Sequence, residues 1–285
     1  GYGHRNTLYV MSILNSPLPP MNEQELRAHL TRHFAPINGC VCKWSETALA
    51  PADAVVATFW ETAQRVHEVR NASGTVFYLV QDWEPFFYAM GAEYLQAEQT
   101  YRMGFPCITL GRWLSERLRA MYGADAEHFD FAVDHAIYHP RAAPPGSTRR
   151  VCFYARPSTP RRLYALGVKA LELVHRRHPE VDIVLFGCAD ADLKAAPITF
   201  PYRNLGILKE RELAELLASS AIGLVLSSTN CSLLPPELMA SKCAVVDLNR
   251  ETVRGVLEHE VNALLADPLP ESIAAAILRL DRKST

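Results

Sequence analysis

The sequence has no long apolar run, no excess of charge and no cluster of cysteines, and each absence excludes a class of protein. No stretch of the 285 residues approaches the length of a membrane-spanning helix, and none has the form of a secretory signal peptide. The formal net charge is only −2, so no basic excess is available for binding nucleic acid. We therefore expect a cytoplasmic protein whose main partner is not a nucleic acid.

The seven cysteines are scattered and odd in number. Cys40 and Cys42 are the only close pair, and one intervening residue is not a usual zinc or redox spacing. We interpret the cysteines as free thiols in a reducing compartment. His135 and His139 stand four residues apart, but no carboxylate or cysteine completes a ligand set, so we predict no bound metal.

Glycine is also scarce, with 14 residues, and neither a dinucleotide fingerprint nor a P-loop is present. This argues against a nicotinamide- or ATP-dependent enzyme. Apolar residues make up 49% of the chain, which is enough for sizeable cores. Residues 141–148 are rich in proline and glycine, and they mark a linker between an amino-terminal domain at 1–140 and a carboxyl-terminal domain at 149–285.

Apolar periodicity and turn residues predict alternating strands and helices, an α/β protein with parallel sheets. Helices are expected at residues 22–34, 61–69, 93–102, 112–122, 163–175, 210–219, 237–243, 250–258 and 271–280. Strands are expected at residues 40–43, 54–58, 75–80, 106–110, 151–154, 181–186, 204–207, 221–226, 244–246 and 262–265. At the amino terminus, a glycine turn at Gly1–His4 leads into an amphipathic segment from Asn6 to Asn15.

Residues 229–247 organise the carboxyl-terminal half. The strand before them ends in four turn-forming residues, Ser227 to Asn230, and Pro235 and Pro236 can begin a helix with Glu237 in its first turn. A polar loop and a helix N-terminus therefore lie at the carboxyl end of a parallel strand, where open α/β sheets bind ligands. Glu237 has two interpretations, because it either complements the helix dipole or binds a ligand.

This stretch resembles the donor site of retaining GT-B glycosyltransferases of family 4. Their signature is a Glu, seven residues, a second Glu, then Ala/Met-Ala-x-Gly and an apolar strand. Glu237 matches the second Glu, which implies a contact with the donor ribose, whereas Thr229 stands at the first Glu and Lys242 at the Gly. The form Thr-Asn-x-Ser-x-x-Pro-x-Glu is similar to the rhamnosyltransferase-like branch.

The resemblance implies an α/β GT-B fold, with two Rossmann-like domains facing a cleft. Residues 1–140 would form the acceptor side and residues 149–285 the nucleotide-sugar donor side. In the family, a first strand and a glycine loop precede an amino-terminal helix. The sequence has the loop, and we expect the first strand to be missing.

The family also has an Arg, four residues and a Lys in the loop after the first strand of the donor domain. Arg156 matches the Arg, and Arg161 stands at the Lys position. The resemblance implies that both bind the donor diphosphate, and arginine is well suited to phosphate. We expect Thr229, Asn230 and Ser232 to contribute further contacts to phosphate or sugar. Solvated loop arginines are the alternative interpretation.

The strand at 75–80 runs into Gln81-Asp-Trp-Glu-Pro85. The resemblance implies a polar residue after this strand near the reacting sugar, and Asp82 is the first candidate for a catalytic residue, with Glu84 the second. A solvated loop acid or a cap is the alternative. Three aromatic residues at 86–88 suit the apolar face of a sugar, although core packing explains them equally well.

The resemblance thus implies a retaining hexosyltransferase that needs no metal or cofactor. It would move a sugar, with rhamnose as a candidate, from a nucleotide-sugar to a glycan or lipid-linked glycan acceptor in surface polysaccharide synthesis. The alternatives are a non-catalytic GT-B binding or scaffold module of a larger polysaccharide-assembly protein, and a nucleotide-sugar epimerase. The helix at 112–122 carries three arginines on one side, either as a solvated face or as a peripheral contact with the inner face of the membrane.

Overall fold

The computed structural model describes residues 4–14, 17–44, 49–69, 74–141, 149–195 and 197–281. The chain divides into two compact units, Gly1–Tyr78 and Leu79–Thr285. The predicted linker lies, from residue 142 to residue 148, outside the described residues, as do residues 1–3 of the predicted glycine turn. The domain boundary predicted at 141–148 therefore stays a prediction.

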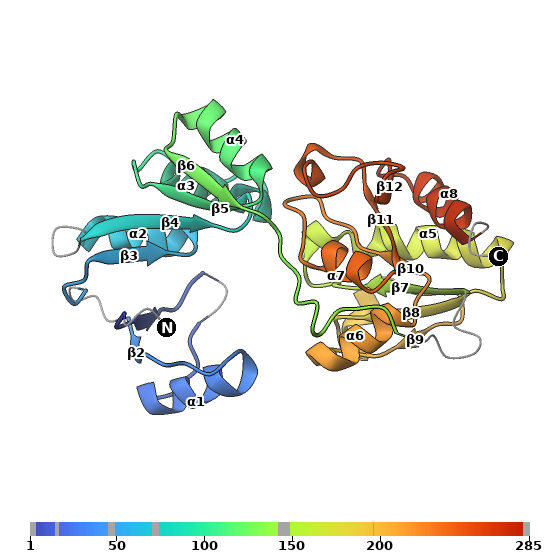
Figure 1. The fold of residues 1–285 in the computed structure, drawn as a ribbon, viewed down its shortest axis with the longest axis horizontal. Helices are drawn as coiled ribbons and strands as arrows, with labels where there is room; N and C mark the ends of the chain where they lie inside the picture. The colour runs from blue at the N-terminus through green and yellow to red at the C-terminus, as the bar shows by residue number, and fades with distance from the viewer. Residues whose placement is uncertain are drawn as a thin grey trace. The chain divides into compact units, whose positions relative to one another are not determined.

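The first unit contains two pairs of parallel strands and two helices (Figure 1). Its elements are β1 (Thr7–Val10), α1 (Glu23–His33), β2 (Cys40–Lys43), β3 (Ala54–Ala57), α2 (Trp60–Val69) and the first residues of β4 (Thr75–Val80). Helix α1 begins as predicted, because Asn22 and Glu25 exchange side-chain and backbone hydrogen bonds in a capping box. The amphipathic segment predicted at 6–15 is instead strand β1, which forms because Thr7–Val10 pair with β2.

Residues 79–140 of the second unit carry two helices, two strands and a short 3₁₀-helix. These elements are η2 (Glu84–Phe87), α3 (Ala92–Thr100), β5 (Cys107–Leu110), α4 (Arg112–Tyr122) and β6 (Ala126–Phe129). The strand order of this sheet is β3-β4-β5-β6. Strand β6 is not among the predicted strands, because Ala126-Glu-His-Phe129 has no apolar alternation. Its parallel pairing with β5 makes it a strand.

The remainder of the second unit is a six-stranded parallel sheet in the order β12-β11-β10-β7-β8-β9. Its strands are β7 (Arg150–Tyr154), β8 (Asp182–Phe186), β9 (Arg203–Asn204), β10 (Ile222–Leu224), β11 (Ala244–Leu248) and β12 (Ala263–Ala266). Its helices are α5 (Tyr164–Arg177), α6 (Glu210–Ala218), α7 (Leu234–Ala240) and α8 (Pro270–Asp281), with the 3₁₀-helices η4 (Pro160–Arg162) and η5 (Asp190–Ala195). The alternation confirms the predicted α/β class with parallel sheets.

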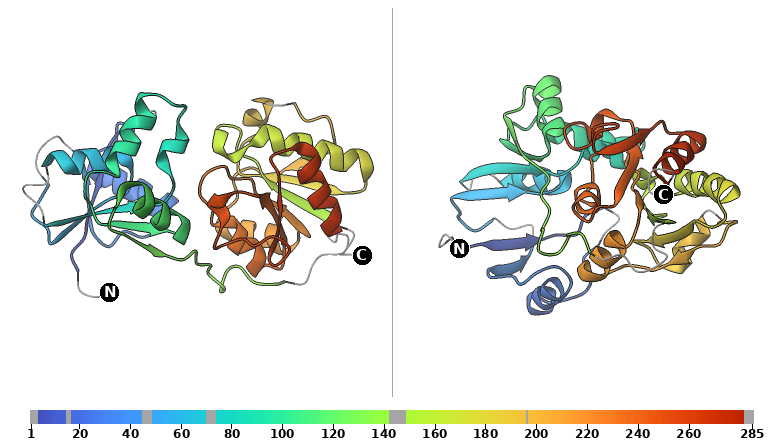
Figure 2. Two further views of the ribbon diagram at one scale, coloured as in Figure 1. Left: turned by 90° about the horizontal axis from the view of Figure 1, so that it is seen from above. Right: turned by 45° about the vertical axis from the view of Figure 1, so that its right-hand side comes forward.

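Helices cover both faces of this sheet, and strand β7 shows why (Figure 2). Val151 and Phe153 pack among residues of α5 and α8, whereas Cys152 packs on the opposite face among residues of α6 and α7. Helix α5 lies so close to the sheet that a Cβ on Gly167 would be 2.3 Å from the Phe153 ring. Each such fully buried apolar side chain stabilises the fold by about 1.5–3 kcal/mol.

The helix predicted at 250–258 is not formed. A single 3₁₀ turn, η6 (Glu251–Val253), stands in its place. Gly255 has a φ of +85°, a left-handed conformation that a continuing α-helix excludes. Here the local apolar spacing predicted a helix that the backbone does not follow.

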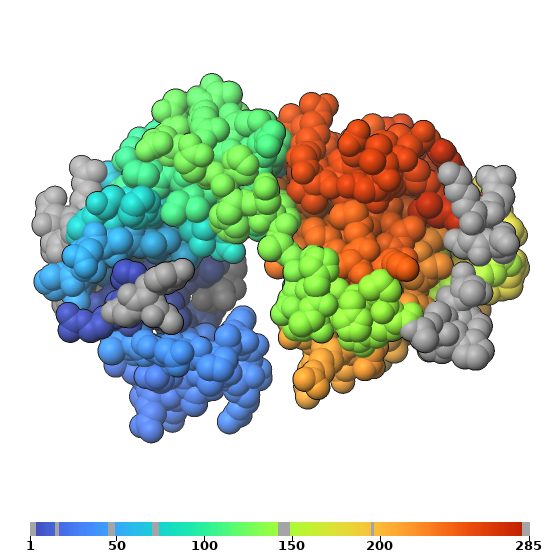
Figure 3. Space-filling model, viewed as in Figure 1, coloured from blue at the N-terminus to red at the C-terminus, as the bar shows by residue number. Residues whose placement is uncertain are grey.

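The segment that follows β6 packs on the face covered by α6 and α7. Tyr138 is buried in the same cluster as Leu234 and Leu238 of α7, with Phe131 and Ile137 packed against it. Figure 3 shows part of this segment, in light green, lying on the orange surface of α6 and α7. The segment thereby carries a tyrosine to the N-terminal turn of α7.

Candidate functional site

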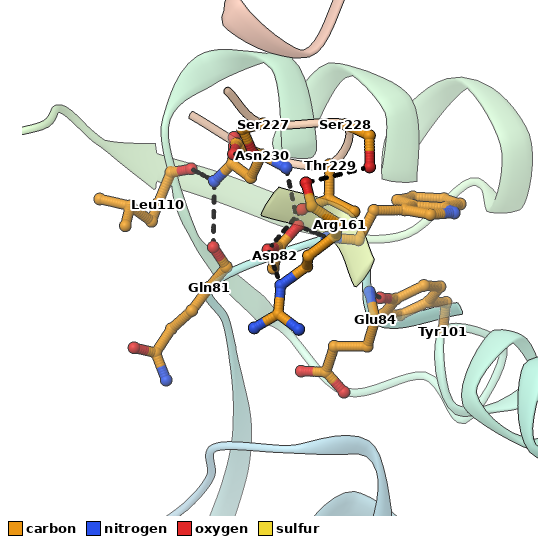
Figure 4. A network of polar contacts seen from close by, with 11 residues as sticks. Gln81, Asp82, Glu84, Tyr101, Leu110, Arg161, Ser227, Ser228, Thr229 and Asn230 are labelled. Atoms are coloured by element: carbon orange, nitrogen blue, oxygen red, sulfur yellow. Dashed lines mark hydrogen bonds and ion pairs between the residues drawn. The ribbon is translucent and has the colours of Figure 1, made fainter. Parts of the chain in front are cut away.

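Loops from several strands meet in the second unit, at the carboxyl ends of the strands. They are residues 81–87 after β4, the end of β5, the turn η4 after β7, and residues 227–232 after β10 (Figure 4). Carboxyl ends of parallel strands are the usual ligand-binding edge of an α/β sheet. Most residues that the sequence singled out lie on these loops or on the helix that follows β10.

Helix α7 begins where its two prolines allow it to begin. Pro235 and Pro236 occupy the first turn, and Glu237 lies in that turn as well. The helix packs tightly on β10, since a Cβ on Gly223 would be 2.5 Å from the Leu238 side chain. Lys242, at the position where the resembling family has Gly, has a φ of +60°. This left-handed conformation costs a non-glycine residue about 1 kcal/mol, so the family's preference for Gly has a backbone reason here.

Asp82 is the most densely hydrogen-bonded of the predicted site residues. Its Oδ1 accepts hydrogen bonds from the backbone N–H of Trp83 (2.7 Å) and of Asn230 (2.8 Å). Its Oδ2 accepts one from the Thr229 hydroxyl (2.9 Å) and lies 3.9 Å from Nε of Arg161. Burial raises the pKa of Asp82 above its usual value, although these four contacts all oppose that shift.

Asn230 is buried and holds three loops together. Its Nδ2 donates to the carbonyl oxygens of Gln81 and Leu110, each at 3.0 Å. Its own carbonyl accepts the Ser227 hydroxyl at 2.8 Å. Thr229 is likewise fully buried. The structure therefore brings Thr229 and Asn230 together with Asp82, and it commits their polar groups to bonds within the protein.

Arg161 lies between the loop after β4 and the loop after β10. Its guanidinium stacks over the Phe87 ring at 4.1 Å from the centroid. Its carbonyl accepts hydrogen bonds from the N–H (3.0 Å) and the hydroxyl (3.3 Å) of Ser228. The aromatic run at 86–88 thus contributes Phe87 as a platform for an arginine, a cation–π contact that the sequence did not predict.

Arg156 is held apart from this network. Its Nη1 donates to the Tyr154 hydroxyl at 2.9 Å, and its guanidinium lies 5.8 Å from the centre of that ring. Arg162 lies at the same distance from the Tyr154 ring, so one tyrosine of β7 contacts two arginines. The hydroxyl of Ser232 is buried, and among the described residues it has no hydrogen-bond partner.

Glu237 is hydrogen-bonded to the hydroxyl of Tyr138. Burial raises the pKa of Glu237 to about 7, the hydrogen bond from Tyr138 opposes that shift, and the negative charge of Glu210 adds to it. The sequence did not single out Tyr138. The turn that carries Tyr138 is closed by its backbone N–H, which donates to the carbonyl of Asp134 at 2.8 Å.

Glu84, the second catalytic candidate, is buried to 2% exposure. Its backbone N–H donates to the Tyr101 hydroxyl at 3.1 Å. Its carboxylate points away from Asp82 and from the loop after β10 (Figure 4). Through its backbone N–H and Tyr101, Glu84 belongs to the group of residues drawn around Asp82 (Figure 4).

A further acid beneath the loop after β10, Asp247, is fully buried at the end of β11. Its Oδ1 accepts from the backbone N–H of Ser227 (3.1 Å) and of Leu248 (2.7 Å). Burial raises its pKa to about 7, and the two hydrogen bonds and the charge of Arg162 oppose the shift. In the sequence, Asp247 directly follows three apolar residues of a strand. This pattern does not indicate that the Asp247 side chain is buried.

The predicted basic face of α4 is mostly engaged in contacts. Arg117 lies over the Trp83 ring at 4.5 Å and pairs with Glu251 at 2.8 Å, and Arg119 pairs with Glu127 at 2.9 Å. Of the helices in the described ranges, none combines the length and apolarity needed to span a bilayer. Peripheral membrane contact stays a prediction.

The described residues contain no group of three or more His, Cys, Asp or Glu side chains that could hold a metal ion. The seven cysteines are free thiols. The positive charges near the loops after β7 and β10 come from Arg156, Arg161 and Arg162. This arrangement can bind an anion through guanidinium groups.

Two family models match separate parts of the chain. The model of the WsaF C-terminal domain matches residues 149–278, and that of the WsaF N-terminal domain matches residues 43–112. The O-antigen biosynthesis protein RfbC of Myxococcus xanthus is 37% identical over 236 residues, which are 81% of this chain and 18% of that protein. The chain therefore spans less than a fifth of the length of this curated relative.

Several solved structures are similar to that of this chain. HepE of Anabaena, in complex with UDP-glucose, superposes with a TM-score of 0.64 at 15% identity, covering 82% of this chain and 70% of HepE. TarM gives the same TM-score and identity, covering 81% of this chain and 48% of TarM. HepE in complex with UDP and glucose covers 99% of this chain and 92% of HepE, with a TM-score of 0.67 and 13% identity. The chain therefore has the GT-B fold, and the two matched regions are WsaF-like domains.

Proposed function

We propose that the chain is a glycosyltransferase that moves a sugar from a nucleotide-sugar donor to a glycan or lipid-linked glycan during synthesis of a surface polysaccharide. One observation carries the proposal. The region that matches the WsaF C-terminal domain presents three arginines and Glu237 on the loops and the helix N-terminus at the carboxyl edge of a parallel sheet. The likeness to RfbC supports the assignment to polysaccharide synthesis.

In this proposal the arginines neutralise the donor diphosphate. A guanidinium has five N–H donors. The contacts described above use only some of these donors in Arg156 and Arg161, so the others can bind phosphate oxygens. The buried hydroxyl of Ser232 adds one further donor. Neutralising the diphosphate stabilises the leaving group electrostatically, so the reaction proposed here proceeds without a metal.

Glu237 binds the ribose hydroxyls of the donor. Its carboxylate is oriented by Tyr138, which is itself buried and packed on α7. We infer a uridine nucleotide as the first donor to test, because HepE, which has the same fold, forms complexes with UDP-glucose and UDP. A hexose, with rhamnose as a candidate, transferred with retention of configuration from the cytoplasmic side, follows from the family resemblance.

A non-catalytic binding or scaffold module is the second candidate, and two observations favour it. The chain corresponds to less than a fifth of RfbC, so it is comparable to one part of a larger protein. Thr229 and Asn230, which were predicted to contact the donor, use their polar groups on Asp82, Gln81 and Leu110 instead. Such a module would bind a nucleotide or a glycan without transferring sugar.

The test begins with a thermal-shift screen of UDP, GDP and dTDP, since a ligand at one hundred times its Kd stabilises the folded state by about 2.7 kcal/mol. The matching sugar nucleotides are then incubated with and without a glycan acceptor, and products are identified by mass spectrometry. A glycosylated acceptor supports the proposal. Nucleotide binding without transfer supports the scaffold, and a changed sugar nucleotide in the absence of acceptor identifies an epimerase.

Arginine variants connect the assay to the site. Arg161→Ala should weaken binding of the nucleoside diphosphate, whereas Arg176→Ala is the matched control. Arg176 is an exposed arginine of α5 that pairs with Glu172 at 3.0 Å, away from the loops of the site. Equal affinities of the two variants would refute the assignment of the diphosphate site.

A further inference from the structure

Hydrogen bonds within the protein use most of the acceptor capacity of the Asp82 carboxylate. A carboxylate offers about four lone-pair sites. Three of them accept hydrogen bonds from Trp83, Thr229 and Asn230, at 2.7, 2.9 and 2.8 Å. The guanidinium of Arg161 lies at 3.9 Å from Oδ2, on the fourth side. Little capacity is left for a proton or a hydroxyl of a sugar.

The same contacts join the loop after β10 to the loop after β4 and to the end of β5. The loop after β10 donates two hydrogen bonds to Asp82, and its Asn230 side chain donates two more, to Gln81 beside Asp82 and to Leu110 at the end of β5. We call Asp82, Thr229 and Asn230 the clasp. Thr229 and Asn230 are buried to 0% and 2% exposure, so their bonds are made out of water, where an unpaired partner is costly.

The clasp also fixes the residues proposed to bind the donor. In the loop after β10, the clasp residues Thr229 and Asn230 come shortly before Ser232, whose hydroxyl is buried. Helix α7, which carries Glu237, follows this loop. Arg161 is bonded to this loop through Ser228 and faces Asp82 from the other side. Asp82 is therefore linked to the loop after β10, and through this loop to the start of α7 and to Arg161.

We propose that Asp82 is a positioning residue, whose carboxylate holds the loop after β10 and Arg161 in the arrangement that binds the donor diphosphate. This inference rests on the proposed function. It differs from the direct chemical role predicted for Asp82 from the sequence, in which the carboxylate acts on the sugar. If Asp82 positions the loop, a substitution at Asp82 weakens nucleotide affinity. If Asp82 acts on the sugar, the substitution lowers turnover and leaves nucleotide affinity unchanged.

The experiment is a double-mutant cycle on the full chain, with Asp82→Asn, Thr229→Val and both together. Thr229→Val removes the hydroxyl that donates to Asp82, and Asp82→Asn removes the negative charge and replaces one acceptor oxygen with an NH2 donor; both keep the side-chain shape. UDP affinity is measured by calorimetry, turnover by the transfer assay, and stability by urea unfolding. Ser220→Ala is the control, because Ser220 is a buried residue whose hydroxyl donates to the Leu216 carbonyl at 2.7 Å, outside the clasp.

Positioning predicts that each single variant weakens UDP binding about tenfold, and that the double variant does so by about tenfold rather than a hundredfold, because coupled residues are not additive. The control loses stability and keeps its UDP affinity. An Asp82→Asn variant that binds UDP like the parent and loses only turnover would overturn the inference in favour of direct chemistry. Additive losses would overturn it as well.

The outcome also separates this inference from the proposal on which it rests. A parent chain that binds UDP, together with clasp variants that bind it equally well, refutes positioning alone. A parent chain that binds none of UDP, GDP and dTDP refutes the donor site and this inference together.

Discussion

Donor binding should depend on pH through Glu237. Burial raises the pKa of this carboxyl to about 7, and only the ionised form presents both oxygens purely as acceptors to the two ribose hydroxyls. With a pKa near 7, the ionised fraction rises from about one tenth at pH 6 to about nine tenths at pH 8. If the ionised form alone binds, affinity for the donor rises about tenfold across this range.

The ligand must not titrate in the same range. A terminal phosphate has a second pKa near 6, so the assay uses a sugar nucleotide such as UDP-glucose, in which the sugar esterifies that phosphate. Calorimetric Kd values from about pH 6 to about pH 8 give the profile. The Glu237→Gln variant should bind weakly at every pH, because its side chain keeps its size and no longer ionises.

Two neighbours of Glu237 should move the midpoint in opposite directions. Tyr138→Phe removes the hydrogen bond that lowers the pKa of Glu237, so the rise in affinity should shift to higher pH. Glu210→Gln removes a nearby negative charge that raises it, so the rise should shift to lower pH. A parent affinity that is constant over this range, or a tenfold rise that persists in Glu237→Gln, would refute the assignment of Glu237 to the ribose.

Four further outcomes are expected. Arg156→Ala should weaken nucleoside diphosphate binding by about 1.5–3 kcal/mol, the range for hydrogen bonds to charged groups, and unchanged calorimetric affinity would contradict this role. Asp247 has a pKa raised to about 7 in the folded chain from 3.8, so its contribution to stability is present at low pH and is lost as pH rises through 7. Asp247→Asn should therefore reduce the fall in the urea midpoint between about pH 4 and about pH 7, and an unreduced fall would count against it. Lys242→Gly should stabilise the fold by about 0.5–1 kcal/mol, since Lys242 has a φ of +60°; a lower urea midpoint would show that its side chain contributes more than the backbone strain. Donor binding should survive excess chelator, and a loss restored by manganese or magnesium would reveal a metal site.

Much of the fold was predictable because it depends on local patterns. Thr75–Val80 and Arg112–Tyr122 were predicted with the bounds that the structure has, since an uninterrupted apolar run and an amphipathic period are written in consecutive residues. The start of α7 at two prolines was predictable for the same reason, because the two prolines are consecutive residues. Strand β6 could not be predicted in this way, because its partner β5, and not its own composition, makes it a strand.

The sequence predicted which residues belong to the candidate site, but not which of them contact one another. The family resemblance identified Arg156, Arg161 and Glu237 as residues of one ligand-binding edge, and these roles stay predictions. Spacing could not show that Tyr138 bonds to Glu237, because the two residues are far apart in the chain and meet only when the segment after β6 packs on α7.

The sequence by itself determined most of the segments that become strands and helices, and which loops carry the charged residues. Only the tertiary structure decided what those residues touch. Asp82 and Thr229 are 147 positions apart, yet their side chains lie 2.9 Å from each other. No local rule relates them, since their contact arises from the packing of loops at the ends of different strands. The pKa of about 7 at Glu237 and at Asp247 has the same origin, because burial of a carboxyl is set by the atoms around it and not by its neighbours along the chain.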